Sequence, residues 1–463
     1  MKLAPLKKGE MPEPLPLRKL IGPSFILLGL GLGSGELILW PYLASNFGLG
    51  IMWAAVLGIT FQFFLNMEIA RYTLITGESV FVGLARKLAR VAPAWFILST
   101  LLPWIWPGII AASATVLASF LRIKYVPFLP MGMLFLIGII LTLGPVLYKT
   151  QETLQKLVIL VSVPFVFALT FFLASPTDWR VLAEGLVGKG RDYWFFPVGL
   201  PLATFLGAFA YAGAGGNLNL AQSLYVKAKG YGMGKFSGQI TSILTGKKEK
   251  MTLEGTTFEC TENNLANFKL WWQRMNIEHV IVFWGTGALT MLILGVLAYT
   301  TVYGNEGNEA GIGFVINEAT FVANRAGMVM GKLFLLSVMV MLFFTQFSVF
   351  GSTSRIMAEN LVIFSPQKFR IEKIPVFFYS FLWLQILAGM IIFGLGFTEP
   401  LTLVIISAVL NAFTMFVYSG LLLWLNLTSL DKRLRPGILR VGVITTTFLF
   451  YGFFCGFVIW QHA

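Results

Sequence analysis

Long apolar segments alternate with short polar connections along most of the chain. Windows of about 20 apolar residues, the length that crosses a bilayer as a helix, cover residues 22–44, 48–70, 94–120, 129–148, 154–175, 196–229, 277–302, 328–353, 375–396, 400–426 and 438–460. We refer to these segments as the first to the eleventh span. The pattern predicts an all-α, polytopic membrane protein with a transmembrane domain over residues 21–460.

Composition and charge agree with this prediction. The 463 residues are 57% hydrophobic and 12% charged, whereas soluble domains are about 25% charged. The net charge of +13 could indicate nucleic-acid binding, but 27 of the 34 Lys and Arg residues fall in alternate connections. The positive-inside rule then predicts a cell-membrane protein with a cytoplasmic tail over residues 1–20 and an extracellular or periplasmic C-terminus. The bilayer is therefore the expected partner, and nucleic acid is not.

One polar connection, residues 230–276, is large enough to form structure of its own. Lys247–Lys250 resembles a turn between two strand-like runs, 239–244 and 251–260. Thr261 is a suitable N-cap for an amphipathic helix over 262–275. We predict a cytoplasmic loop with this helix lying at the membrane interface, and a regulatory site is the alternative.

The first span carries an unusual centre, Gly31-Leu32-Gly33-Ser34-Gly35-Glu36. Glycine weakens a helix interior, and Glu36 is the only acid predicted deep inside any span, where a charge is costly. The sixth span is too long for one straight crossing and is interrupted by Gly213-Ala214-Gly215-Gly216-Asn217. Both features are typical of interrupted helices that build a transport site, since free backbone groups are tolerated only beside a cavity.

The order of the spans predicts the overall architecture. Spans one to five and spans six to ten make the same number of crossings from opposite sides, and each group begins with an interrupted helix. Such a five-plus-five inverted repeat, here followed by an eleventh helix, is the arrangement of LeuT-type secondary transporters, with helices 1 and 6 unwound at mid-membrane.

The candidate binding residues come from these interruptions and from lone polar positions in other spans. Glu36 and Asn217 are the candidate metal ligands, although Glu36 could instead bond to free amides of its own helix, and Asn217 could be a helix cap. Gln346 and Asn411 either complete the site or form hydrogen bonds between helices. The full predicted set is Gly33, Ser34, Glu36, Tyr211, Gly213, Ala214, Asn217, Gln346 and Asn411.

Enzymatic chemistry is not indicated. His279 and His462 are the only histidines, and the cysteines Cys260 and Cys455 lie far apart in sequence, so no His- or Cys-based catalytic or metal centre is expected. No cofactor is predicted. At the cytoplasmic ends of spans, we expect interfacial ion pairs or a gate from Glu68, Arg71, Glu278 and His279.

Several short motifs resemble the Nramp family of divalent-metal transporters. Gly22-Pro23-x-Phe25, followed by Gly29 and the break at Gly33–Glu36, is similar to the family's G-P-G-F…D-P-G-N first helix. Thr76-Gly77-Glu78 resembles its T-G segment after the second helix, and Asn217-Leu218-x-Leu220 matches the end of its M-P-H-N-L-Y-L motif. The resemblance implies eleven spans and secondary transport of a divalent cation, which would be cargo and not a cofactor.

The chain departs from the family at its ligands. Gly33 stands in place of the metal-binding Asp, Glu36 in place of Asn, and Ala214 in place of the methionine, while Gly216 and Ala221 replace the two sixth-helix histidines. Loss of the thioether leaves a harder, oxygen-based site, which favours magnesium or manganese. In lacking the methionine, the chain is similar to the Nramp-related magnesium transporters. The missing histidines and third-span acids argue against proton coupling.

A second resemblance keeps organic cargo open. Gly33-Ser34-Gly35 and Phe209-Ala210-Tyr211 are similar to the G-S-G and F-A-Y elements of amino-acid permeases. In that case, exposed amides would hold a substrate carboxylate, and Glu36 could contact an ammonium group. The prediction is a divalent-cation transporter that works by alternating access, with a transporter of amino acids or other small organic solutes as the alternative.

Overall fold

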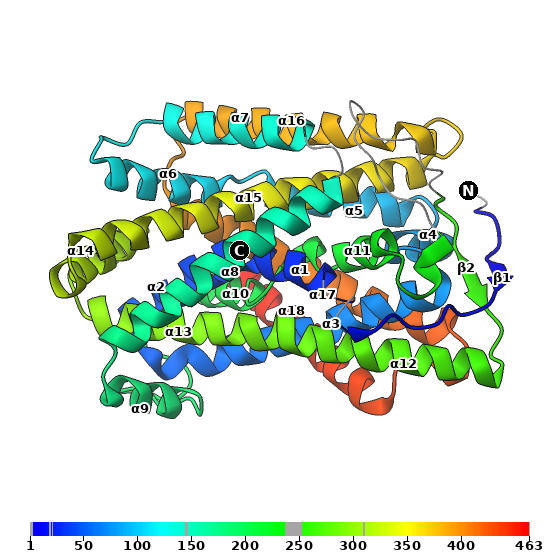
Figure 1. The fold of residues 1–463 in the computed structure, drawn as a ribbon, viewed down its shortest axis with the longest axis horizontal. Coiled ribbons are helices and arrows are strands. Elements are labelled where there is room, and N and C mark those ends of the chain that lie inside the picture. The colour runs from blue at the N-terminus through cyan, green and yellow to red at the C-terminus, as the bar shows by residue number, and fades with distance from the viewer. Residues whose placement is uncertain are drawn as a thin grey trace.

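Helices that run along the long axis of the molecule form the body of the structure (Figure 1). The computed structural model describes residues 3–17, 20, 22–143, 147–236, 252–308 and 311–462. Its first half contains β1 (Lys7–Gly9), α1 (Pro23–Gly31), η2 (Leu32–Leu39), α2 (Trp40–Phe47), η3 (Leu49–Ile51), α3 (Met52–Thr76), α4 (Val80–Leu88), α5 (Val91–Trp104), α6 (Gly108–Leu121), α7 (Phe128–Leu143), α8 (Leu147–Leu173), α9 (Pro176–Gly185), α10 (Leu202–Ala210), η4 (Gly216–Leu218), α11 (Ala221–Lys229) and η5 (Gly232–Phe236). The remainder contains β2 (Thr256–Phe258), α12 (Glu262–His279), η6 (Val280–Gly285), α13 (Thr286–Val302), α14 (Gly313–Ala326), α15 (Met328–Phe364), η7 (Ile371–Lys373), α16 (Ile374–Gly394), α17 (Pro400–Ser429), η8 (Lys432–Leu434) and α18 (Ile438–His462).

Each of the eleven predicted spans is helical. Within the described ranges, nine helices are long and apolar enough to cross a membrane. The other two predicted spans correspond to α7, a shorter apolar helix, and to the interrupted pair α10 and α11. The prediction of an all-α, multi-pass membrane protein is therefore confirmed.

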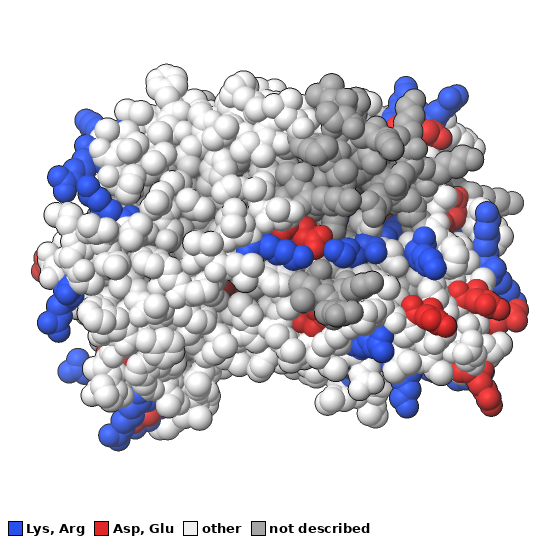
Figure 2. All heavy atoms as spheres, viewed as in Figure 1, with Lys and Arg blue, Asp and Glu red and all other residues white. Residues whose placement is uncertain are grey.

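The connections separate into two groups at opposite ends of the long axis. The N-terminal strand, α4 and the start of α12 lie at one end, and α9 and α14 lie at the other (Figure 1). This is the grouping that the predicted alternation of sides requires. On the visible face, charged side chains gather toward both ends of the long axis, and one further group lies near the middle (Figure 2).

The connection between the sixth and seventh spans differs from its prediction. Thr261 does cap a helix, because its hydroxyl accepts a hydrogen bond from the Asn264 N–H at 3.3 Å. The helix does not lie separately at the interface, however: it continues through a π-helical stretch into the seventh span, giving one helix over Glu262–Val302. The reason is that no proline or glycine separates the amphipathic part from the apolar part.

The predicted tail packs against this connection. Strand β1 pairs in parallel with β2, in the register Lys7 to Thr256. Further along the tail, the indole of Trp271 donates a hydrogen bond to the Pro12 carbonyl at 2.8 Å. The second predicted strand-like run therefore pairs with the tail; the first run and the Lys247–Lys250 turn lie outside the described residues.

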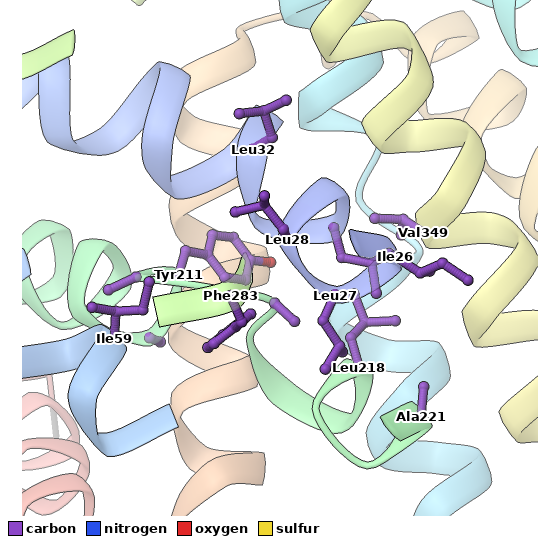
Figure 3. Packing of buried hydrophobic residues seen from close by; sticks show 14 of the residues in the cluster. Ile26, Leu27, Leu28, Leu32, Ile59, Tyr211, Leu218, Ala221, Phe283 and Val349 are labelled. Atoms are coloured by element: carbon purple, nitrogen blue, oxygen red, sulfur yellow. The ribbon is translucent and has the colours of Figure 1, made fainter. Parts of the chain in front are cut away.

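The third span contains an interruption that the apolar pattern did not predict. Helix α5 ends at Trp104 and α6 begins at Gly108. Pro103 and Pro107 flank the gap, and proline removes a helical hydrogen bond and clashes with the preceding turn. Part of the buried hydrophobic core brings together the first, second, sixth, seventh and eighth spans, with Leu28 of the first span, Leu218 of the sixth and Val349 of the eighth among its members (Figure 3).

Candidate functional site

The first span is interrupted by a π-helix. Helix α1 ends at Gly31, residues Leu32–Leu39 form the π-helix η2, and α2 continues from Trp40. The regular α-helix is lost where the sequence predicted, but the backbone stays helical instead of unwinding. A π-helix has i to i+5 hydrogen bonds and is often found at functional sites, and the glycine-rich sequence Gly31–Gly35 lowers the cost of departing from the α-helix.

The sixth span is broken completely. Helix α10 ends at Ala210, and a single 3₁₀ turn at Gly216–Leu218 precedes α11. The sequence placed the interruption at Gly213, so the helix ends about one turn earlier than predicted. Gly213, Gly215 and Gly216 have φ angles of 134°, 75° and 52°, a region that residues with a side chain seldom adopt. Glycine is required at this break for conformational reasons.

The two interruptions lie directly against each other. A Cβ on Gly31 would lie 2.6 Å from the carbonyl oxygen of Gly213, and one on Gly35 would overlap with the carbonyl oxygen of Tyr211. On the other side of the first span, a Cβ on Gly33 would lie 2.6 Å from Thr345 of α15. The glycines thus allow the backbone of the first span to contact the exposed carbonyls of the sixth.

Glu36 is buried within this contact region. Its side chain is 0% exposed, and neither carboxylate oxygen has a hydrogen-bond partner among the described residues. Oε1 faces the seventh span, 3.4 Å from the place of a Cβ on Gly287, beside Leu28 and Ile59. The alternative that Glu36 bonds to amides of its own helix is therefore wrong. The Ser34 hydroxyl also lacks a partner among these residues.

Asn217 faces a different helix. Its Nδ2 donates hydrogen bonds to the hydroxyls of Ser99 and Thr100 in α5, both at 2.8 Å. Its Oδ1 is buried without a partner within the described part of the chain. Asn217 thus ties the sixth span to the third and does not act as a helix cap, and joint ligation of a metal by Glu36 and Asn217 stays a prediction.

Tyr211 begins a hydrogen-bond chain that leads to the tenth and third spans. Asn411 Nδ2 donates to the Tyr211 hydroxyl at 2.9 Å, and Ser407 donates to the Pro103 carbonyl at 2.7 Å. Because the one hydrogen of Ser407 is used there, Tyr211 must donate to Ser407, at 2.7 Å. Asn411 therefore forms hydrogen bonds between helices, and its Oδ1 points at Gly216.

Beside Tyr211 lies a small cavity. It has a volume of about 10 Å³ and is lined mainly by Trp104, Trp106, Tyr211, Gln346 and Ser407. The Trp104 and Tyr211 rings are stacked with centroids 5.5 Å apart. The volume corresponds to about one water molecule. Gln346 thus lies near Tyr211 in an aromatic environment, and its part in a binding site stays a prediction.

The sequence reading missed Gln62, in the middle of the second span. Its Nε2 donates to the Ala210 carbonyl at 2.9 Å, and its Oε1 accepts from the Gly215 N–H at 3.2 Å. The side chain thus bridges both ends of the sixth-span break. The available signal was a lone amide within an apolar span, the same signal that led to Gln346 and Asn411.

Near the ends of the spans, the expected ion pair is present. Arg71 forms a salt bridge with Glu68 at 2.7 Å, and Arg440 contacts the same carboxylate at 3.3 Å. Ser24 contacts both Glu278 and His279. Within the described ranges, no group of three or more His, Cys, Asp and Glu residues could hold a metal ion, so a cation would need backbone, amide and hydroxyl oxygens beside one carboxylate.

The interrupted first and sixth helices and the order of the spans define the LeuT-type fold, and comparison with solved structures confirms it. A mutant of the manganese transporter of Eremococcus coleocola aligns with a TM-score of 0.64 at 14% sequence identity, over 96% of this chain and 89% of that chain. Mhp1, a nucleobase-cation-symport-1 family transporter, in a closed conformation with bromovinylhydantoin bound, aligns with a TM-score of 0.54 at 13% identity, over 93% and 83% of the two chains. No family model and no curated protein matches the sequence. At these identities, the likeness shows the fold alone.

Proposed function

We propose that this protein is a secondary transporter that carries a divalent cation, magnesium or manganese, across the membrane by alternating access. The observation that carries the proposal is Glu36. It is a fully buried carboxylate with no hydrogen-bond partner among the described residues, and it lies at the contact between two interrupted helices. An ionised carboxylate without a partner is costly to bury, and a bound cation would offset that cost.

The other available donors are all oxygens. Besides Glu36, the Ser34 hydroxyl and the Asn217 Oδ1 have no partner within the described residues. The carbonyls of Tyr211 and Gly213 become available when the first span moves away from the sixth. Hard oxygen donors without thioether, thiolate or imidazole suit magnesium and manganese. The manganese transporter of Eremococcus coleocola, with which this chain shares a fold, supports the choice of cargo.

Uptake into proteoliposomes tests the proposal. Magnesium, manganese and calcium are offered separately to the purified protein, and internal cation is measured with an indicator dye. We expect uptake of magnesium or manganese and its loss in Glu36→Gln, which keeps the shape of the side chain but not its charge. Glu184→Gln, an acid on the exposed helix α9, is the matched control. Undiminished uptake by Glu36→Gln would show that this carboxylate is not the cation site.

A small organic solute is the second candidate, because aromatic rings line the cavity beside Tyr211, which would have to widen from its present volume of about 10 Å³ to admit such a solute. Aromatic stacking and a few polar groups are common features of organic ligand sites, and the Mhp1 structure was obtained with a hydantoin bound. A panel of amino acids and nucleobases in the same vesicles tests this candidate. It predicts that Trp104→Ala abolishes solute uptake, whereas the cation proposal predicts retained cation uptake in that variant.

A further inference from the structure

A buried cluster of three polar side chains joins the first span to the seventh at their cytoplasmic ends. The Ser24 hydroxyl lies 2.5 Å from Oε2 of Glu278 and 2.7 Å from Nδ1 of His279. Ser24 and His279 are 0% exposed, and Glu278 is 5% exposed. Glu278 Oε1 and His279 Nε2 have no hydrogen-bond partner among the described residues.

Counting hydrogens shows that this cluster has two states. Ser24 has one hydroxyl hydrogen, so it cannot donate both bonds. If Glu278 is ionised, Ser24 donates to it and His279 Nδ1–H donates to Ser24. If Glu278 is neutral, its O–H donates to Ser24, and Ser24 donates to an unprotonated Nδ1. Both states keep both hydrogen bonds, and they differ in net charge by one.

The surroundings contain other charged and titratable groups. Lys156 on α8 and Lys229 on α11 lie near Glu278, but both bond to Glu152, at 2.5 and 3.0 Å. Tyr231, after α11, also lies near Glu278, and so does the backbone of Gly22.

Around His279 the surroundings are aromatic. The imidazole stacks on Phe63 of α3 and on Phe283 of η6, at centroid distances of 5.6 and 4.7 Å. A charged imidazolium there would lose its hydration. In the buried cluster, the state without net charge is therefore the less costly one.

The position of the cluster connects its proton to conformational change. Ser24 belongs to the first group of five spans, and Glu278 and His279 belong to the second. The π-helix η2 separates α1, which carries Ser24, from the rest of the first span, so α1 can move against the start of the seventh span when the cytoplasmic side opens. Parting of the cytoplasmic ends would expose Glu278 to water, where an ionised carboxylate is well solvated.

We propose that Ser24, Glu278 and His279 form a proton-binding site between the two repeats, occupied when the cytoplasmic side is closed and emptied to the cytoplasm when it opens. The role of this site rests on the proposed transport function, but the experiment that tests the site does not require transport. It makes proton release a step of the inward-opening movement, by residues other than those that line the two helix breaks. By linkage, acid favours the closed form and alkali the open form.

A cysteine-labelling experiment tests the site without any cargo. Leu27 is 0% exposed and lies on α1, the helix that carries Ser24, so Leu27→Cys should react with a maleimide only when the cytoplasmic ends part. The background carries Cys260→Ser and Cys455→Ser. We expect the labelling rate, corrected for thiolate fraction with an exposed cysteine, to rise between pH 5.5 and 8 by up to about tenfold per pH unit for one proton.

Two variants make the result decisive. Glu278→Gln keeps a hydrogen-bond donor to Ser24 but cannot ionise, so its labelling should stay slow and independent of pH. Ser79→Ala removes another hydroxyl–carboxylate bond between the repeats, from Ser79 to Glu359, and should keep the wild-type pH dependence. If Glu278 cannot be changed without loss of folded protein, Ser24→Ala is used, and we expect it to shift the midpoint of the pH profile.

The outcomes separate this inference from the proposed cargo. A flat wild-type profile, or a wild-type profile that persists in Glu278→Gln, overturns the proton site. A flat pH profile in Ser79→Ala would also overturn the proton site, because the loss of any hydrogen bond between the repeats would then remove the pH dependence. A pH-dependent wild type with a flat Glu278→Gln supports the site even if no divalent cation is transported.

Discussion

The first and sixth spans are both rich in glycine at their centres, but glycine has a different role in each. In the first span, residues Leu32–Leu39 stay helical, and the glycines remove side chains so that a second backbone can approach. In the sixth span, Gly213, Gly215 and Gly216 have positive φ angles, and the helix ends. The glycines of the first span thus serve packing, and those of the sixth span serve backbone conformation.

This difference determines which groups each span can offer to the proposed cargo. The first span keeps its backbone hydrogen bonds within a helix and therefore contributes side chains, Ser34 and Glu36. In the sixth span, the break leaves backbone groups outside any helix, and Gln62 forms hydrogen bonds with two of them. The site is thus asymmetric, with charge from one helix and carbonyls from the other.

The largest effect is expected for Gly35→Ala in the first span. The added Cβ would overlap with a main-chain carbonyl of Tyr211, which cannot move without moving the sixth span. We expect a loss of about 3 kcal/mol, the upper part of the usual range for overpacking, seen as a lower thermal midpoint and less monodisperse protein in detergent. Gly456→Ala in α18 is the control, because a Cβ there would meet nothing within 4 Å. Equal midpoints for the two variants would mean that the close approach is absent.

Gly216→Ala in the sixth span should cost less. Its φ of 52° imposes a strain of about 1–2 kcal/mol on an L-residue, and the new Cβ would also overlap with Oδ1 of Asn411, a side chain that can shift. In an Asn411→Ala background, the overlap with Oδ1 is gone, and the backbone strain remains together with a 3.0 Å contact to the Cβ of residue 411. A double-mutant cycle of thermal midpoints measures the coupling, and purely additive losses would contradict the proposed contact.

Gln62→Met removes the bridge across the sixth-span break. The Ala210 carbonyl and the Gly215 N–H lose their partner in a buried setting, which costs about 1–2 kcal/mol. Thr115→Val is the control, since its hydroxyl bonds only within its own helix, to Ala111. A thermal midpoint for Gln62→Met no lower than that of the control would show that the break does not depend on this side chain.

The sequence predicted the spans and both interruptions because apolar length and glycine clusters are local signals. It did not predict that η2 stays helical, since a π-helix and an unwound segment share the same glycines. It also could not assign partners: Asn217 faces Ser99 and Thr100, and Glu36 faces Gly287. Such contacts depend on helix rotation, which a span with apolar residues on all sides does not specify. The sequence pattern also does not predict the continuous helix from α12 to α13, because a change from amphipathic to apolar residues is typical of a boundary between two elements.

The smallest effect concerns Asn217, which has two roles that can be separated. Its Nδ2 binds the third span, and its Oδ1 is the proposed cation ligand. Ser99→Ala removes one of the Nδ2 bonds and should cost about 0.5–1.5 kcal/mol while cation uptake in proteoliposomes continues, because Oδ1 remains. Asn217→Ala should lower both the thermal midpoint and uptake. If Ser99→Ala reduces uptake as much as Asn217→Ala does, Asn217 acts by positioning the sixth span, and the ligand oxygens must then come from Glu36 and the backbone carbonyls.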